Sequence, residues 1–196
     1  FENEWVNIDA LIPLEQQGVR FRPALAALAP LVDKLSQRTL LDELAIPSPP
    51  WCPLSLISPA QPSLPPGWNF PVMAKAARGG YDGKGTIVLE NIDALAQLLR
   101  SVDISDWLLE TWVDYERELA LVVSRDAKGR LRSFPLVETH QHDQVCDWVL
   151  APADINHDVD LMVKNVVSSL LAELDYVGVI AIEFFYGSEG LLVNEI

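Results

Sequence analysis

The stretch that decides the fold is Lys75-Ala76-Ala77-Arg78-Gly79-Gly80-Tyr81-Asp82-Gly83-Lys84-Gly85. It begins at the end of a predicted strand, Phe70 to Ala76, and leads into a second one, Thr86 to Leu89. Glycines let successive backbone N–H groups approach phosphate oxygens, while Lys75 and Lys84 add positive charge. The spacing matches neither a Walker A loop nor a dinucleotide GxGxxG turn. The stretch therefore indicates a phosphate-binding hairpin loop, with a mobile, solvated loop as the alternative.

Composition narrows the class of protein. The 196 residues are 49% hydrophobic, which is enough for one substantial core or two small ones. A net charge of -14 argues against a nucleic-acid partner and against a polybasic membrane-surface protein. Cys52 and Cys146 lie outside any CxxC spacing, so we expect neither disulfide nor zinc and assign the chain to the reducing cytoplasm. The opening Phe1-Glu2-Asn3-Glu4 lacks Met and signal-peptide order, so we expect a piece of a longer chain.

Hydrophobic periodicity predicts strands and helices in alternating blocks. Two helices are expected between Pro23 and Leu44, with Pro30 opening the second, and further helices at Ile92 to Leu99 and Val159 to Leu174. Further strands are expected at Trp51 to Leu56, Trp107 to Val113, Glu118 to Ser124, Leu131 to Val137, Gln144 to Leu150, Val177 to Phe185 and Leu191 to Ile196. Because most strands follow one another in hairpin order, the predicted class is α+β with mostly antiparallel sheets.

Two acidic residues interrupt the last two apolar strands. The short turn between these strands places Glu183 opposite Asn194 or Glu195. Facing carboxylates repel, so we expect a raised pKa or a basic neighbour, with Lys75 or Arg38 as candidates. Oxygen ligands of this kind suit Mg²⁺, which usually also takes substrate phosphate oxygens. The alternative is that one acid pairs with a lysine or arginine, or faces water.

Other polar residues carry weaker signals. The strand segment Glu110-Thr111-Trp112-Val113 could read an adenine through a free backbone edge, and Glu118 could hold ribose hydroxyls, although acids at strand ends are usually solvated. Arg38 on a helix, and His140 and His142 in an expected loop, support no functional role by themselves.

Taken in order, these segments resemble the ATP-grasp family, and within it the N5-carboxyaminoimidazole ribonucleotide synthetases. The resemblance covers nearly the whole chain and is most specific at Arg78 to Gly85. The other matching segments are Phe1 to Glu4, Gln37 to Pro47, Asp175 to Glu183 and Leu191 to Glu195. The resemblance implies that residues 1–30 are the tail of an N-terminal domain with a linker. Residues 31–196 would be a truncated ATP-grasp domain, with a small lid part near 70–112 and a larger part near 113–196.

The resemblance also implies roles for individual residues. Arg38, Lys75 and Lys84 would act on the ATP phosphates, and Glu183 and Glu195 would ligate Mg²⁺, with Mn²⁺ as an alternative. The implied nucleotide contacts are Arg38, Lys75, Gly80, Tyr81, Asp82, Gly83, Lys84, Gly85, Thr86, Glu110, Thr111, Trp112, Val113, Glu118, Gln141, Asn194 and Glu195. Gln141 occupies the position of a family histidine by ungapped counting, and a one-residue shift would put His140 or His142 there instead.

The implied activity is carboxylation of aminoimidazole ribonucleotide by bicarbonate, driven by ATP through a carboxyphosphate, in purine biosynthesis. The resemblance implies a homodimeric parent enzyme. Because the chain stops at Ile196, we expect it to be the ATP-binding core and inactive alone. The alternatives are another ATP-grasp carboxylate–amine ligase and a catalytically silent nucleotide-binding module.

Overall fold

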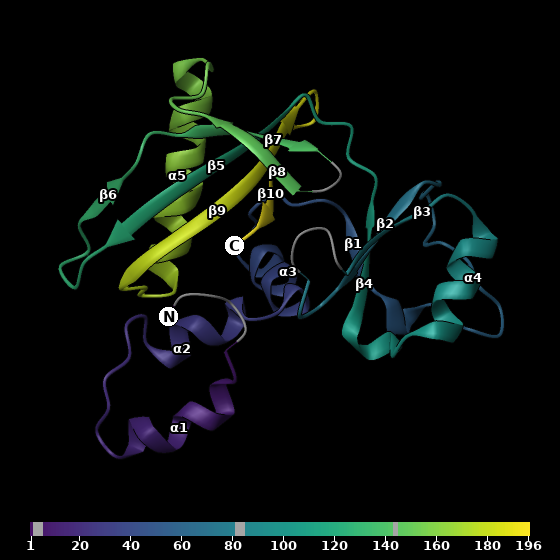
Figure 1. Cartoon of the computed structure of the whole chain (residues 1–196), viewed down its shortest axis with the longest axis horizontal. Helices are drawn as coiled ribbons and strands as arrows, with labels where there is room; N and C mark the ends of the chain where they lie inside the picture. The colour runs from purple at the N-terminus through teal and green to yellow at the C-terminus, as the bar shows by residue number, and fades with distance from the viewer. Residues whose placement is uncertain (2–5, 81–84, 143–144) are drawn as a thin grey trace.

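The computed structural model describes residues 1, 6–80, 85–142 and 145–196. Two sheets lie on either side of helix α3, and each carries a helix of its own (Figure 1). Every strand pairing in the described part of the chain is antiparallel. The predicted α+β class is therefore confirmed. None of the helices in the described ranges is both long and apolar enough to cross a membrane.

The small sheet has the strand order β1-β4-β2-β3. Its elements are β1 (Trp51–Pro53), η2 (Leu54–Leu56), β2 (Val72–Ala76), β3 (Thr86–Leu89), α4 (Ile92–Ser101), η3 (Ile104–Asp106) and β4 (Trp107–Thr111). Asn91 caps α4 by accepting a hydrogen bond from the Ala94 N–H, and the helix packs Leu95 and Leu98 against this sheet. Because β1 belongs to this sheet, the small unit takes in residues ahead of the predicted 70–112 segment.

The large sheet has the order β10-β9-β5-β7-β8, with β6 paired to β5. Its strands are β5 (Arg117–Arg125), β6 (Leu131–Ser133), β7 (Val137–His142), β8 (Val145–Leu150), β9 (Gly178–Gly187) and β10 (Gly190–Glu195). Helix α5 (His157–Glu173) forms a core with the buried residues of this sheet. On β9, Ile180 and Ile182 are buried in that core, so the period of two leaves Ala181 and Glu183 on the open face.

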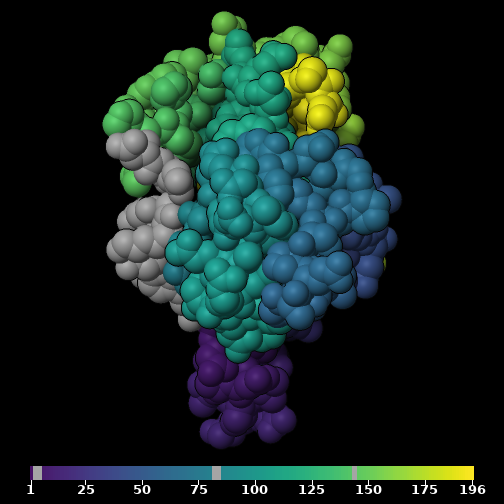
Figure 2. Space-filling model, turned by 90° about the vertical axis from the view of Figure 1, so that its right-hand side faces the viewer, coloured from purple at the N-terminus to yellow at the C-terminus, as the bar shows by residue number. Residues whose placement is uncertain are grey.

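The N-terminal segment contributes three helices and a short turn. These are α1 (Ile8–Gln16), α2 (Leu25–Leu28), η1 (Ala29–Leu31) and α3 (Lys34–Glu43). The sequence analysis missed α1, which protrudes at the base of the molecule (Figure 2) and has no buried residue. The predicted start of the second helix at Pro30 is wrong, because Pro30 lies in η1 and Asp33 caps α3.

The segment predicted as one strand from Leu131 to Val137 is interrupted. It forms the end of one hairpin as β6, passes Pro135, which has no N–H to donate to a ladder, and continues as β7. As a result His140 and His142 lie on β7, and their predicted place in a loop is wrong. The predicted strand Trp51 to Leu56 is a strand only over Trp51–Pro53, because Leu54–Leu56 form the 3-10 turn η2. The remaining predicted strands and helices recur with shifts of a few residues at their ends.

Candidate functional site

The β9–β10 hairpin brings the two predicted metal-binding acids together. Glu183 pairs with Glu195, and a register shift between Val193 and Glu195 leaves Asn194 as an extra residue in β10. A bulge of this kind re-aims side chains, and here the Asn194 amide Nδ2 lies 3.5 Å from Glu183 Oε2. The predicted pairing is confirmed, and it places three oxygen-bearing side chains at one point on the open face of the sheet.

The pKa of Glu183 reflects its burial and the charged residues around it. Burial among surrounding protein atoms raises the pKa of Glu183 to about 7, with further contributions from Glu195 and Glu118. The positive charges of Lys75 and Lys34 act in the opposite direction but do not outweigh them. The expected raised pKa is therefore confirmed, and the nearby positive charges do not fully offset the effects of burial and of the neighbouring acids.

Lys34 is the functional residue that sequence reasoning missed. Lys34 is the first residue of α3, and its Nζ donates a hydrogen bond to Glu195 Oε1. Lys34 is therefore the basic neighbour of Glu195. Of the two predicted candidates, Lys75 acts on Glu183 through its charge, whereas Arg38 contacts Glu110. The only signal in the sequence is the spacing of Lys34 and Arg38, which puts two cations on one face of a helix.

The acidic pair and the asparagine fit a hard divalent cation such as Mg²⁺, because all three offer oxygen atoms. Among the described residues, no group of three or more His, Cys, Asp or Glu could hold a metal ion. The protein would thus supply Glu183, Glu195 and the side-chain amide oxygen of Asn194, and water or phosphate oxygens would complete the shell. A cation bound here would offset both effects that raise the pKa of Glu183, first the burial of its carboxyl group and then the repulsion from Glu195.

Lys75 links the glycine stretch to the acidic pair. It lies at 8% exposure on β2, and its Nζ lies 2.8 Å from Glu110 Oε2 and 3.0 Å from Asn194 Oδ1. Glu110 is only 2% exposed, and burial opposes its ionisation. The charges of Lys75 and Arg38 outweigh this effect and hold the pKa of Glu110 below its usual range. The carboxylate therefore stays ionised and keeps Lys75 aimed at the site.

Arg38 lies deeper than a typical phosphate contact. It is 2% exposed on α3, and its Nε donates to Glu110 Oε1 at 2.8 Å. Nη2 donates to the Asn194 carbonyl at 2.7 Å, and Nη1 donates to the Val193 carbonyl at 3.3 Å. Each guanidinium nitrogen thus has a protein acceptor, and the contact with ATP phosphates remains a prediction.

The two ends of the glycine stretch meet beside Lys75. Tyr81, Asp82, Gly83 and Lys84 lie outside the described residues, whereas Gly80, Gly85 and Thr86 are described. The Ala76 N–H donates to the Gly85 carbonyl at 2.7 Å, and Thr86 pairs with Lys75 in the ladder. A Cβ atom on Gly85 would come within 3.2 Å of Ala76 Cβ and of Gly80 Cα, and φ of Gly85 is 83°. Only glycine suits this closure.

The predicted adenine-binding segment is partly used by the sheet itself. Glu110 pairs with both Trp51 and Met73, and the Thr111 N–H donates to the Pro50 carbonyl. The expectation of a free strand edge is therefore wrong for Glu110 and Thr111, because β1 covers that side of β4. Trp112 and Val113 follow the end of β4, and Trp112 is exposed.

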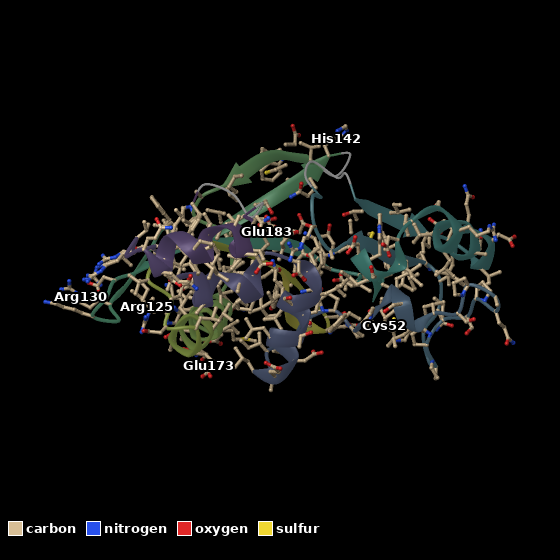
Figure 3. The ribbon with its side chains drawn as sticks, turned by 90° about the horizontal axis from the view of Figure 1, so that it is seen from below. Cys52, Arg125, Arg130, His142, Glu173 and Glu183 are labelled. Carbon is tan, nitrogen blue, oxygen red and sulfur yellow. The ribbon has the colours of Figure 1, made fainter. Side chains whose placement is uncertain are left out.

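The remaining predicted nucleotide contacts lie on the open side of the large sheet. Glu118 on β5 pairs with Phe185 of β9, and its charge reaches Glu183. Gln141 is partly buried on β7, just after a register shift at His140. His140 stacks on Trp148 with ring centroids 4.7 Å apart. Figure 3 places Glu183 near the middle of the molecule.

Comparisons with known proteins identify the family. The family model described as "ATP-grasp domain" matches residues 39–196. The chain is 45% identical over 196 residues to a Synechococcus elongatus protein named N5-carboxyaminoimidazole ribonucleotide synthase, covering 100% of this chain and 49% of that protein. A protein of the same name from Synechocystis is 43% identical over 205 residues, covering 100% of this chain and 51% of that protein.

A solved structure also matches. It is a carboxyaminoimidazole ribonucleotide synthase from Aspergillus clavatus complexed with ATP, with a TM-score of 0.85 and 25% identity, covering 98% of this chain and 50% of that one. The chain thus spans about half the length of the curated relatives and of the solved structure that it matches.

Proposed function

Because this chain belongs to the ATP-grasp family, we propose that it is the ATP- and Mg²⁺-binding core of a carbon–nitrogen ligase. The reaction that we propose joins bicarbonate to the amine of 5-aminoimidazole ribonucleotide, forming N5-carboxyaminoimidazole ribonucleotide with ADP and phosphate. Relatives with that name match the whole chain, and a solved structure carrying ADP and 5-aminoimidazole ribonucleotide has a similar fold.

The observation that carries the proposal is the meeting of Lys75 with Asn194 beside the acidic pair. Lys75, at the start of the glycine stretch, lies 3.0 Å from the side-chain amide oxygen of Asn194, and the amide nitrogen of Asn194 contacts Glu183. Bound phosphates are commonly held by positively charged side chains and by a bridging divalent cation, and this arrangement offers a lysine beside oxygen atoms that could hold such a cation. The protein is otherwise strongly acidic, so the positive charge is supplied locally.

The proposed division of roles follows the geometry. Glu183, Glu195 and the side-chain amide oxygen of Asn194 would hold Mg²⁺, which would neutralise charge on the transferred phosphoryl group. The phosphates would be held by Lys75 together with Lys84 and the loop residues Gly80, Tyr81, Asp82, Gly83, Gly85 and Thr86. Trp112 and Val113 would read the base from their backbone, with Glu118 on the ribose and Gln141 beside the nucleotide.

The protein itself supplies positioning and charge rather than a covalent nucleophile. In the proposed reaction, ATP phosphorylates bicarbonate, and the carbon of the resulting carboxyphosphate is attacked by the substrate amine. Holding both reactants in one site lowers the barrier by removing the entropy of their encounter. Positive groups near the phosphoryl oxygens then stabilise the charge that spreads over them.

The finer parts of the proposal concern the whole enzyme. We propose bicarbonate and aminoimidazole ribonucleotide as small-molecule substrates, a homodimer as the assembly and the cytoplasm as the location.

The direct test measures ADP release by the full-length polypeptide that contains this chain. Release should require ATP, Mg²⁺, bicarbonate and aminoimidazole ribonucleotide together, and Glu183→Gln should abolish it. The matched control is Glu189→Gln, which removes the same charge in the turn of the same hairpin and should leave the rate unchanged. ADP release with a different acid and amine would indicate another ATP-grasp ligase, and nucleotide binding without turnover would indicate a silent module.

A further inference from the structure

A hollow at one end of the large sheet is lined by four arginines. Its volume is about 490 Å³, which is in the range of sites that hold small molecules. The loop between α1 and α2 supplies Arg22, the end of β5 supplies Arg125, and the β5–β6 hairpin supplies Arg130 and Arg132. A chain with a net charge of -14 thus gathers four cations around one depression of its surface.

Two glycines allow these segments to approach one another. A Cβ atom on Gly178 would lie 3.3 Å from Pro23 Cδ, so the missing side chain lets the segment that carries Arg22 pack against the start of β9. A Cβ atom on Gly129 would lie 3.6 Å from Arg125 Nη2, which places this guanidinium against the β5–β6 turn. Gly178 is also the ladder partner of Arg125. The three segments therefore surround one space.

Two of the four arginines are paired with carboxylates. Arg125 Nη1 donates to Asp175 Oδ1 at 3.0 Å and to the Tyr176 carbonyl at 2.9 Å, and its side chain is only 15% exposed. Arg130 Nε donates to Asp126 Oδ2 at 2.7 Å. Hydrogen bonds from Arg130 lower the pKa of Asp126, so this carboxylate is ionised at neutral pH and neutralises one cation.

The other two arginines keep an uncompensated charge. Arg132 Nη1 donates to the Leu131 carbonyl at 2.9 Å, which leaves its guanidinium without a carboxylate among the described residues. Arg22 makes no hydrogen bond or ion pair with any residue in the described ranges. Both side chains are exposed, so their N–H groups are accessible from solvent. Like charges repel one another, and an anion bound in the hollow would relieve that repulsion.

The hollow is separate from the proposed nucleotide site. Arg125 and Glu118 lie on the same strand, β5, at a separation that corresponds to about 23 Å of extended chain. Figure 3 shows Arg125 and Arg130 toward one end of the molecule and Glu183 near its middle. An anion in the hollow would therefore contact neither Lys75 nor the acidic pair.

We propose that this hollow is a second anion site, which binds the diphosphate group of a small molecule. Guanidinium groups hold phosphate oxygens through paired, charge-assisted N–H donors. Because the uncompensated Arg22 and Arg132 belong to different segments, the ligand that fits has two phosphate groups rather than one. Val179, which is 66% exposed in the lining of the hollow, offers an apolar surface to a nucleoside attached to the diphosphate.

The test titrates the full-length polypeptide that contains this chain with inorganic pyrophosphate by calorimetry, in EDTA. The double variant Arg22→Met/Arg132→Met removes the two uncompensated charges and should weaken binding at least about tenfold. Exposed side chains of this kind contribute little to stability, so its Tm should match that of wild type. The control Arg100→Met/Lys164→Met removes two cations outside the hollow and should bind pyrophosphate like wild type.

ADP is titrated in the same way to identify the source of the diphosphate. The difference between wild type and the double variant is taken for each ligand, so that binding at any other site cancels. A difference for pyrophosphate alone identifies an inorganic anion as the ligand, whereas a larger difference for ADP shows that a nucleoside also contacts the hollow. Either result supports a diphosphate site.

Three results would overturn the inference. Wild type could fail to bind either ligand, the double variant could bind both as tightly as wild type, or the control could lose as much affinity as the double variant. The second result would assign the diphosphate to the nucleotide site, and the third would show unspecific attraction to positive charge. Should the double variant not fold, Arg22→Met alone decides, because Arg22 has no contact with the described residues to lose. Wild-type affinity in Arg22→Met would then contradict the site.

Discussion

Glu183 and Glu195 face each other across the β9–β10 ladder, although like charges at paired positions destabilise a sheet. Their neighbours only partly compensate this repulsion. Lys34 donates to Glu195 and Asn194 lies within 3.5 Å of Glu183, yet burial, together with the charges of Glu195 and Glu118, still raises the pKa of Glu183 to about 7. The hairpin thus places a charge conflict at a position where a divalent cation would resolve it.

The stability of the metal-free protein should fall as pH rises from about 4.5 to about 7. In the unfolded chain Glu183 releases its proton near its ordinary pKa of 4.5, whereas the folded protein holds it until about pH 7. Folding therefore binds a proton in this window, and raising the pH removes that stabilisation. Solvent screening limits the effect to about 1 kcal/mol, or about 2–4 °C in Tm. Thermal melts in EDTA at pH 5 and pH 8 would measure it.

The control for this pH dependence is a pair of glutamine variants. Glu183→Gln should have a smaller fall in Tm between pH 5 and pH 8, because the titrating group is gone. Glu189→Gln, in the turn of the same hairpin, should keep the fall of wild type. Equal pH dependence in wild type and Glu183→Gln would mean that other groups cause it.

Replacing either acid should weaken Mg²⁺ binding far more than it weakens the fold. Glu183→Gln and Glu195→Gln each remove one of two protein carboxylates, so Mg²⁺ affinity should fall by at least about tenfold. Glu183→Gln also relieves repulsion, so its Tm in EDTA should equal or exceed that of wild type. In the full-length enzyme, turnover should fall much more than Tm. Early melting with near-normal activity for both variants would show that the acids are structural.

Lys34→Met should make the site more negative without removing any proposed ligand. The Lys34 charge lowers the pKa of Glu183, so its loss should move that pKa further upward. Above pH 8, which lies above the pKa of Glu183, Mg²⁺ should bind a few-fold more tightly because a competing cation has gone. Calorimetric titration with Mg²⁺ alone would measure this, and Lys164→Met on the exposed side of α5 is the control. Weaker Mg²⁺ binding in Lys34→Met would contradict the competition.

Gly85→Ala should destabilise the protein more than Gly67→Ala does. Both glycines have positive φ, 83° and 84°, so alanine is strained at either position by about 1–2 kcal/mol. At Gly67 a Cβ atom meets nothing within 4 Å, whereas at Gly85 it would lie 3.2 Å from Ala76 Cβ and from Gly80 Cα. The difference between the two variants in the free energy of unfolding, measured in urea, isolates the cost of the close contacts at Gly85. Equal losses would mean that the closure of the glycine stretch adapts without cost.

Much of the fold could be predicted because its signals are local. Asn91 and Asn156 cap the helices that the apolar periodicity predicts, and the short turn before β10 sets the register of the last hairpin. The pairing of Glu183 with Glu195 follows from that turn and from the period of two along each strand. The α+β class and the presence of an acidic pair beside a basic glycine stretch were therefore readable from the chain.

Only the tertiary structure decided which cation meets which acid. Lys34 and Glu195 are 161 residues apart, and Arg38 and Glu110 are 72 apart, so neither spacing nor periodicity relates them. Their contacts depend on how α3 settles between two sheets, and that placement follows from the packing of two separate cores. The sequence by itself determined the chemical groups of the site. The packing of α3 determined that Lys34 contacts Glu195 and that Arg38 contacts Glu110 and Asn194. Such contacts between distant residues depend on the packing of the whole folded chain.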